Sequence, residues 1–362
     1  MRAIRKPFVL GLALLAACGG TRRAEYVFGA AGPWTQAFGQ QNRRGIQLAV
    51  EEINAKGGIN GTKLRVEFQD DAGEGSRAAA IAQRFVDDPS ICAVIGHVTS
   101  GAMMAAARVY DGRLPAVATT ASSPLLSGIS SWTFRVISSD SVNAVNLAHA
   151  ARSLGLKRAA ILYENDSYGR GLARAFRGSF TGDVVSMDPI NSNLSNAEPY
   201  ISFFKQQKPD LVFVAGTDAS GIVILREARR QNLQATFMGG DGWAGVANDV
   251  AAEGALVGTP FSPDDPRASA RTFVDAFRAK YSIDPDGNAA LAYDDTKLLA
   301  AAIAAAGADR VHIRDWLAGL SERAPFAGMS GTIRFDNRGD PVGRGIVLTR
   351  VRNKKLVLER TP

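Results

Sequence analysis

The feature that most constrains this chain is a repeated alternation of short apolar runs with longer segments of helical periodicity. Residues 91–95 and 211–215 are apolar runs of strand length, whereas 39–55 places Ile46 and Ile53 on one helical face. Short apolar strands that alternate with helices of ten or more residues are typical of parallel sheets covered on both faces. The pattern therefore predicts an α/β fold.

The alternation runs through the chain in two series. The first predicts strands at residues 25–28, 64–68, 91–95 and 114–118, and the second at 158–163, 184–187, 211–215 and 235–238. Three more helices are predicted at 268–281, 289–306 and 311–320, followed by strands within 331–335 and 345–358. Because 362 residues are enough for two domains of ordinary size, we expect two doubly wound parallel-sheet lobes.

The N-terminus carries a targeting signal. Basic residues precede an apolar run at 8–17 that is too short to span a bilayer, so residues 1–17 are predicted to be a signal peptide. The run ends in the letters LAAC, which resemble the lipobox of bacterial lipoproteins. That resemblance implies a lipidated Cys18, a tether over 18–23 and attachment to a membrane surface. An ordinary signal peptide followed by a chance cysteine is the alternative.

Several function classes have little support in this sequence. The net charge is +7, but three of those charges belong to the leader and no basic block with interleaved aromatics follows, so nucleic-acid binding is not expected. The three histidines show no ligand spacing, so no metal site is expected. No P-loop, zinc-protease or nucleophile-elbow motif occurs, and neither a cofactor nor a catalytic residue is predicted.

Some titratable residues have ordinary structural interpretations. Cys92 lies in an apolar run and is expected in the core. His97, beside Thr99 and Ser100, is the only candidate for a hydrolytic base, and we interpret it as a structural residue. The adjacent carboxylates at 70–71 and 294–295 are expected to be solvated or to cap helices.

The predicted strand ends are where a ligand site is expected, because open parallel sheets bind ligands beyond the carboxyl ends of their strands. In the first series these ends are rich in hydroxyls. Thr99 and Ser100 precede a helix, and residues 118–124 read ATTASSP. Such hydroxyls can cap a helix, or they can form a cradle for an anion at helix starts, where free N–H groups favour negative charge.

The second series has different chemistry at its strand ends. Its loops bring carboxylates and two aromatic residues: Glu164, Asp166, Asp218, Asp241, Tyr168 and Trp243. A cleft with an anion cradle on one wall and an acid on the other suits a zwitterion. An α-amino acid is the obvious small zwitterion.

Taken together, these stretches resemble a known family, the periplasmic substrate-binding proteins of the leucine/isoleucine/valine-binding type that serve ABC transporters. The likeness is carried in order by GIQLAVEEINAKGGING, AVIGHVTSGA, ILYENDSYGRGLA, ILREARRQNLQATFMGGDG and ALAYDDTKLLAAAI, and it covers residues 24 to 350. It implies the type I periplasmic binding protein fold, in which crossover strands join the lobes. Lobe 1 would comprise 24–137 and 261–337, and lobe 2 would comprise 138–260 and 338–362.

The resemblance also implies a function and a set of ligand contacts. A monomeric extracytoplasmic lipoprotein would capture a branched-chain or other neutral amino acid and deliver it to an ABC transporter permease. Ser100, Thr120 and Ser122 would bind the ligand carboxylate, and Asp241 would pair with its α-ammonium. The implied contacts are Phe38, Ser100, Thr120, Ser122, Tyr168, Thr217 and Asp241. ATTASSP is accordingly expected to be a cradle, with Ser122 or Ser123 also capping the turn before Pro124.

Three departures from the family pattern concern the ligand's side chain more than its amino-acid character. Gly73 and Thr99 stand where a first-lobe disulfide is expected, Phe38 replaces a tyrosine, and an aromatic is missing near Asn288. Trp34, Trp243 and Thr99 are candidates for a side-chain pocket. A binding protein for amides, urea or aromatic acids, and a ligand-sensing lipoprotein of the same fold, stay open as alternatives.

Overall fold

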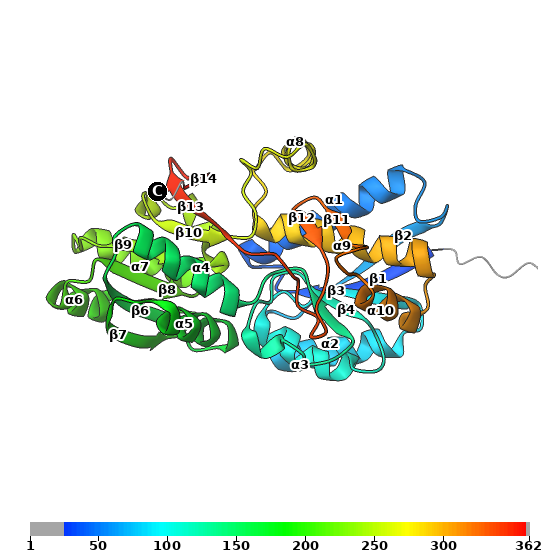
Figure 1. The fold of residues 1–362 in the computed structure, drawn as a ribbon, viewed down its shortest axis with the longest axis horizontal. Helices are drawn as coiled ribbons and strands as arrows, with labels where there is room; N and C mark the ends of the chain where they lie inside the picture. Colours follow the sequence, from blue (N-terminus) through cyan, green and yellow to red (C-terminus); the bar gives the residue numbers. More distant parts are fainter. Residues whose placement is uncertain (1–24, 360–362) are drawn as a thin grey trace, which may run out of the picture.

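Two α/β lobes lie side by side in the computed structural model, which describes residues 25–359 (Figure 1). The predicted signal peptide at 1–17 and Cys18 lie outside the described residues. Each lobe is built on its own sheet, and a separate hairpin pairs β11 (Phe326–Gly328) with β12 (Gly331–Ile333). The two predicted lobes and the α/β class are confirmed.

The first lobe is built on a parallel sheet. Its strands, in spatial order, are β2 (Lys63–Asp70), β1 (Glu25–Gly32), β3 (Ile91–Gly96), β4 (Ala116–Ala118) and β5 (Thr133–Arg135). Every neighbouring pair is parallel. β3 is buried along its whole length, as expected of a central strand whose run ICAVIG is apolar throughout. Cys92 is buried in this strand, as predicted.

Helices cover both faces of the first sheet. They are α1 (Ala37–Ala55), α2 (Gly75–Asp87), α3 (Ser100–Tyr110), α9 (Gly287–Ala306) and α10 (Arg310–Ala318), while α8 (Ala268–Tyr281) packs against α1 and α9. Apolar side chains of α9 and α10 share one core with Phe28 and Ile95, and those of α2 and α3 share another with Ile91. α1 and α9 pack closely at Gly45 because glycine has no Cβ, which would otherwise lie 2.1 Å from the Ala289 carbonyl oxygen.

The second sheet is mixed. Its spatial order is β14 (Lys355–Leu358), β13 (Val347–Arg352), β10 (Leu256–Thr259), β9 (Thr236–Gly239), β8 (Leu211–Ala215), β6 (Arg158–Glu164) and β7 (Asp183–Ile190). β10 to β7 are parallel, whereas β13 and β14 run antiparallel at one edge. Asn353 and Lys354 have positive φ, so they form the tight turn that returns the chain as a hairpin. The parallel core of the second sheet agrees with the prediction, and the strands expected within 345–358 form the antiparallel hairpin at its edge.

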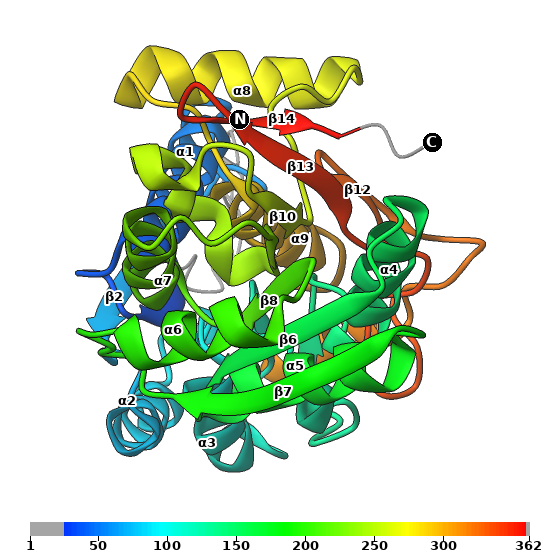
Figure 2. The same ribbon diagram turned by 90° about the vertical axis from the view of Figure 1, so that its left-hand side faces the viewer.

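The second lobe also carries helices on both sides of its sheet. These are α4 (Asp140–Ser153), α5 (Ser167–Ser179), α6 (Glu198–Gln207) and α7 (Asp218–Arg230), with the 3-10 segments η2 (Asp241–Asn248) and η3 (Val250–Ala252). Figure 2 looks onto this lobe and shows β7, β6 and β8 alongside one another. Sequence periodicity missed β5, β10 and α4. The two strands have only three and four residues, and α4 turns Asp140 and Asn143 inward beside small alanines.

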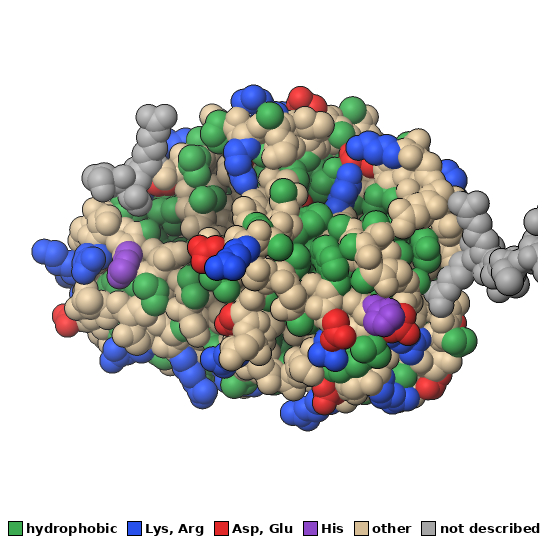
Figure 3. Space-filling model, turned by 45° about the vertical axis from the view of Figure 1, so that its right-hand side comes forward, with side chains coloured by type: hydrophobic (Ala, Val, Ile, Leu, Met, Phe, Trp, Pro, Cys, Tyr) green, Lys and Arg blue, Asp and Glu red, His purple; other side chains and the backbone are tan. Residues whose placement is uncertain are grey.

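The chain passes between the two sheets three times. It leaves the first sheet after β5, returns after β10, and crosses again between β12 and β13. The carboxyl ends of strands from both lobes consequently face the same interlobe space. On the face drawn in Figure 3, Lys and Arg side chains are scattered among polar and apolar ones. Within residues 25–359, no helix has the length and apolar character needed to cross a bilayer.

Candidate ligand-binding site

A small cavity of about 60 Å³ lies between the lobes. It is lined by Phe38, Val98, Thr99, Ser100, Thr120, Asp166, Tyr168, Thr217, Asp241, Gly242 and Asn288. These residues come from α1, from the loops after β3 and β4, from the start of α9, and from the segments that follow β6, β8 and β9. Of the seven ligand contacts predicted from the sequence, the structure gathers all except Ser122 around this one space.

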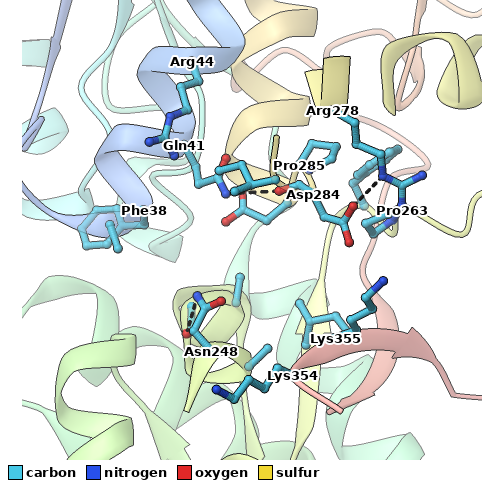
Figure 4. Close-up of a pocket in the computed structure, with 18 of the residues that line it drawn as sticks. Phe38, Gln41, Arg44, Asn248, Pro263, Arg278, Asp284, Pro285, Lys354 and Lys355 are labelled. Carbon is cyan, nitrogen blue, oxygen red and sulfur yellow. Dashed lines mark hydrogen bonds and ion pairs between the residues drawn. The ribbon is translucent and has the colours of Figure 1, made fainter. Parts of the chain in front are cut away.

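A larger hollow of about 440 Å³ adjoins the cavity at Phe38 (Figure 4). It is lined by Arg44 and other residues of α1, by η2, by the Arg278 and Asp284 pair, and by Lys354 and Lys355 of the β13–β14 turn. The loops that follow β6 and β8 do not contribute to it. We therefore regard this hollow as the mouth and the smaller cavity as the ligand site, because the opposed polar groups converge only in the smaller one.

The first-lobe wall presents hydrogen-bond donors. Ser100 lies in the first turn of α3, and its Oγ accepts from Ser123 N at 3.1 Å, so its own hydroxyl proton remains available. The Thr120 hydroxyl donates to Val98 O at 3.2 Å, and its backbone N–H has no hydrogen bond within residues 25–359. The free N–H groups of the α3 start add positive potential. This donor wall, formed by Ser100 and Thr120, suits an anionic group.

The second-lobe wall presents acceptors. Asp241, at the start of η2, accepts from Tyr168 Oη at 3.0 Å, while Tyr168 Oη accepts from Gly242 N at 3.1 Å. The Thr217 hydroxyl donates to Glu164 Oε1 at 2.7 Å, which leaves lone pairs on the Thr217 oxygen. Glu164 is itself 1% exposed. This acceptor wall, formed by Asp241 and Thr217, suits an ammonium group.

The electrostatics of the acceptor wall follow from its burial. Desolvation raises the pKa of Asp241 to about 6, and the hydrogen bonds from Tyr168 and from backbone N–H groups act in the opposite direction. Burial also raises the pKa of Asp166, the N-cap of α5, which accepts from Gly169 N at 2.7 Å. Asp166 still has exposed surface, and it therefore lies on the open side of the cavity. Each carboxylate would gain from a cation placed between the lobes.

Ser122 lies behind the donor wall. It is fully buried, and its hydroxyl donates to Asp140 Oδ2 at 3.0 Å. Ser123 caps the short 3-10 helix η1 (Pro124–Leu126), because its Oγ accepts from Leu125 N at 3.4 Å. The two roles considered for ATTASSP, a cradle for an anion and a cap for a helix or turn, therefore concern different residues. Thr120 faces the cavity, Ser123 caps the turn, and Ser122 supports the loop from below.

The two tryptophans do not line the cavity. Trp243 is fully buried in the core of lobe 2, where a Cβ at Gly239 would lie 2.3 Å from its ring. Trp34 is 7% exposed and packs edge-on against Phe68, with ring centroids 5.6 Å apart. Both follow strand ends, but their side chains turn under the loops into the cores. The third side-chain-pocket candidate, Thr99, does line the cavity.

Four cavity residues were not among the predicted ligand contacts: Val98, Asp166, Gly242 and Asn288. Asp166 and Gly242 lie in the strand-end loops already examined, so their position was a usable signal. Asn288 comes from α9, far along the chain, and only the fold brings it here. Its Nδ2 donates to Asp286 Oδ2 at 3.1 Å, so its carbonyl oxygen is free to accept.

The structure also bears on the predictions for His97 and for the adjacent carboxylates at 70–71 and 294–295. His97 is a structural residue as predicted, since it is fully buried with Nδ1 2.6 Å from Asp71 Oδ2 and Nε2 3.0 Å from Tyr110 Oη. The expectation of solvated acidic pairs is wrong for Asp71, Asp294 and Asp295, all of which are buried. Asp71 is held by His97, and Asp294 accepts from the backbone of the β11–β12 turn.

Two further observations concern disulfides and metals. A Cβ at Gly73 would lie 3.6 Å from Thr99 Cγ2, so the two positions expected for the family's cysteines are neighbours in space. Residues 25–359 contain no cluster of His, Cys, Asp and Glu arranged to hold a metal ion.

Comparison with known proteins agrees with this geometry. A family model described as periplasmic binding protein matches residues 28–355. A Leu/Ile/Val-binding protein homologue of Brucella abortus is 30% identical over 359 residues, covering 93% of this chain and 94% of that protein. A Desulfitobacterium hafniense ABC transporter substrate-binding protein in complex with Leu superposes with a TM-score of 0.80 at 33% identity, covering 92% of this chain and all of that one.

More distant structures share the fold with other ligands. A Rhodopseudomonas palustris solute-binding protein in complex with benzoate has a TM-score of 0.84 at 22% identity, covering 92% of this chain and 95% of that one. The matching family consists of solute-binding proteins and not of enzymes. From the family match, the full-length relative and the two-lobed fold with its interlobe cavity, the chain belongs to the periplasmic binding protein family, in its leucine/isoleucine/valine-binding type.

Proposed function

We propose that this protein captures a neutral α-amino acid in the cavity between its lobes and delivers it to an ABC transporter. The observation that carries the proposal is the opposition of two walls. Ser100 and Thr120 of lobe 1 offer donors, whereas Asp241 and Thr217 of lobe 2 offer acceptors. A zwitterion pairs with both walls, while a ligand that lacks either charge leaves one wall unpaired. Relatives that are amino-acid-binding proteins of the same family support this choice.

The side chain of the ligand would contact the less polar part of the lining. Phe38 and Val98 offer apolar surface, and Asn288 offers a free carbonyl oxygen at the same cavity. The small volume of the cavity, about 60 Å³, favours a branched-chain or similarly sized neutral side chain over a large aromatic one.

Binding would work by closure of the lobes about the three crossings. A ligand that contacts both walls binds the closed state more tightly than the open one, and this differential affinity shifts the population. Lobe 1 would comprise 24–137 and 261–337, and lobe 2 would comprise 138–260 and 338–362. The crossings after β5, after β10 and before β13 fall at or near these boundaries.

The cellular setting follows from the family and from the N-terminus. The family is periplasmic, so the protein works outside the cytoplasm. We further propose that it acts as a monomer and that Cys18 anchors it by lipidation. Mass spectrometry of the protein purified from membranes tests the anchor. A diacyl- or triacyl-modified N-terminal peptide beginning at Cys18 supports it, and an unmodified mature N-terminus refutes it.

Replacement of Asp241 by Ala tests the binding mode. The change removes the buried partner of the ligand ammonium, so affinity for the bound amino acid should fall by about 2–5 kcal/mol, roughly thirtyfold to several thousandfold. Isothermal titration calorimetry against the twenty amino acids measures this loss, and thermal unfolding checks that the fold persists. Full affinity in a folded Asp241→Ala protein would contradict the assignment and would favour a carboxylate-only or amide ligand.

A further inference from the structure

A second pocket lies at the crossings between the lobes and shares no lining residue with the ligand cavity. This hinge pocket has a volume of about 480 Å³. It is formed by the segment that follows β10, by the β11–β12 hairpin and by the segment that leads from β12 to β13, the long red segment before β13 in Figure 1. Two of the three crossings therefore line it, and crossings are the parts of the chain that bend when lobes close.

Three arginines line the hinge pocket. Arg267 comes from the crossing after β10, whereas Arg334 and Arg344 come from the crossing before β13. Two carboxylates line the pocket as well, and each is paired. Asp265 accepts from Arg267 Nε at 2.9 Å, and Glu322 Oε2 lies 3.4 Å from Arg334 Nη1. Arg344 has no carboxylate partner within residues 25–359, so one positive charge of the lining is left without a direct counter-charge.

Neutral groups hold the Arg344 side chain. Its Nη2 donates to Ser330 Oγ at 2.6 Å, and its Nη1 donates to the carbonyl oxygens of Gly331 and Thr332, both at 3.3 Å. Asp294 lies behind Ser330 and accepts from the Ser330 hydroxyl. The carboxylate of Asp294 thus reaches the guanidinium group only through Ser330. Arg344 Nε has no partner in the described part of the chain and stays available as a donor.

The guanidinium groups of Arg267 and Arg344 approach the same point. A Cβ at Gly331 would lie 3.3 Å from Arg267 Nη1 and 3.9 Å from Arg344 Nη1. Arg267 Nη1 is a free donor among residues 25–359, because Asp265 accepts only from Nε and Nη2. Burial lowers the pKa of Arg344, the charge of Asp294 raises it, and the charge of Arg267 lowers it. Two like charges from two different crossings therefore face one space.

We propose that the hinge pocket binds a small phosphate-bearing anion, which Arg267 and Arg344 hold between the two crossings. Guanidinium groups recognise phosphate oxygens through charge-assisted hydrogen bonds in a matching planar geometry. A doubly charged oxyanion compensates both cations at once and relieves the repulsion between them. Arg267 Nη1 and Arg344 Nε are the donors that the protein leaves free for it. This site is separate from the amino-acid site and does not depend on it.

An anion at the hinge pocket also favours closed lobes. The lobes are in contact in this structure, since a Cβ at Gly171 of lobe 2 would lie 2.9 Å from Pro124 Cδ of lobe 1. Bending at the crossings changes the separation of Arg267 and Arg344, so an anion that bridges them has different affinities for the open and closed arrangements. An amino acid and the anion then favour the same state, and each tightens the binding of the other. This consequence rests on the proposed function.

The test is a calorimetric titration of the protein with inorganic phosphate, with chloride at matched ionic strength as the reference anion. Arg344→Gln and Arg267→Gln each remove one pocket charge while keeping an amide donor. Arg271→Gln is the matched control, because Arg271 lies on α8 close to Arg267 and carries the same charge but does not line the pocket. We expect wild-type protein to bind phosphate saturably. Each pocket variant should weaken this binding by about tenfold or more, and the control should leave it unchanged.

Three outcomes would overturn the anion site. They are wild-type protein without saturable phosphate binding, equal binding of chloride and phosphate, and an equal loss of affinity in Arg271→Gln, which would indicate a general effect of charge. If Arg344→Gln does not fold, Arg267→Gln gives the same readout from a side chain that is 44% exposed. Unchanged phosphate affinity in a folded pocket variant overturns the assignment of that arginine.

A second titration tests the coupling to closure. The dissociation constant of leucine for wild-type protein should fall by about fivefold or more when phosphate saturates the hinge pocket, and phosphate should have little effect in Arg267→Gln. An unchanged leucine affinity in phosphate-saturated wild-type protein overturns the coupling. Wild-type protein that binds no amino acid refutes the proposed function instead, and the phosphate titration then still decides the anion site by itself.

Discussion

Amino-acid affinity should weaken as the pH falls from 7 to 5, because the ionised form of Asp241 is the one that pairs with the ligand ammonium. Burial raises the pKa of Asp241 to about 6. The amino acid itself remains a zwitterion across this range, since α-carboxyl groups titrate below it and α-amino groups above it. Protonation of Asp241 is then the change that matters at the acceptor wall.

The size of the effect follows from the fraction of Asp241 that is ionised. The apparent dissociation constant scales with one plus the ratio of protonated to ionised carboxyl, which is about 1.1 at pH 7 and about 11 at pH 5. We therefore expect about a tenfold loss of affinity, or about 1.4 kcal/mol. The affinity must weaken as the pH falls, because Asp241 loses its negative charge as the pH passes through its raised pKa of about 6.

Calorimetric titrations at pH 7, 6 and 5 in one buffer system measure this dependence, with thermal unfolding at each pH as the check on the fold. Asp241→Asn is the control, because it cannot titrate and should bind weakly with little change between pH 7 and pH 5. Equal affinity of the wild type at pH 7 and pH 5, or tighter binding at pH 5, would refute the reasoning.

Two other predictions concern closure and stability. A Cβ at Gly171 would lie 2.9 Å from Pro124 Cδ of the opposite lobe, so Gly171→Ala should hinder closure and weaken ligand binding by about 1–3 kcal/mol. Gly178→Ala on the same helix is the control, because a Cβ there meets only open space and should leave the affinity unchanged. Equal affinities of the two variants in calorimetry would count against this contact. Asp295 is fully buried, and neither carboxylate oxygen has a partner among the described residues. Burial and then the neighbouring Asp294 raise its pKa well above the ordinary value, so the stability present near pH 4 is lost as the pH rises. Asp295→Ala should therefore gain about 1–3 kcal/mol in urea unfolding at pH 7 and less near pH 4, and no gain at pH 7 would show that the carboxyl is paired.

The fold was largely accessible from the sequence because its main strands are continuous apolar runs. Runs such as ICAVIG at β3 and LVFVA at β8 are buried on both faces, and the helices between them have clear periodicity. Short or weakly patterned elements were not accessible. β5 has three residues, and the apolar stripe of α4 is interrupted by the inward Asp140.

The candidate site was accessible to the extent that strand ends define it. Ser100, Thr120 and Asp241 were selected from such positions, and all three line the cavity. What sequence could not supply was side-chain direction. Ser122 and Trp243 follow strand ends as well, yet one turns to Asp140 and the other into a core. Direction depends on the close approach of backbone segments, which no periodicity records.

The most direct test of opposed walls is a crystal structure of the protein with a bound amino acid. We expect one ligand carboxylate oxygen at hydrogen-bond distance, about 2.7–3.2 Å, from Ser100 Oγ and Thr120 N. The ligand ammonium should contact Asp241 and Thr217 on the other side. A ligand bound in the reverse orientation, or seated in the larger hollow beside Arg44 and Lys354, would contradict this expectation.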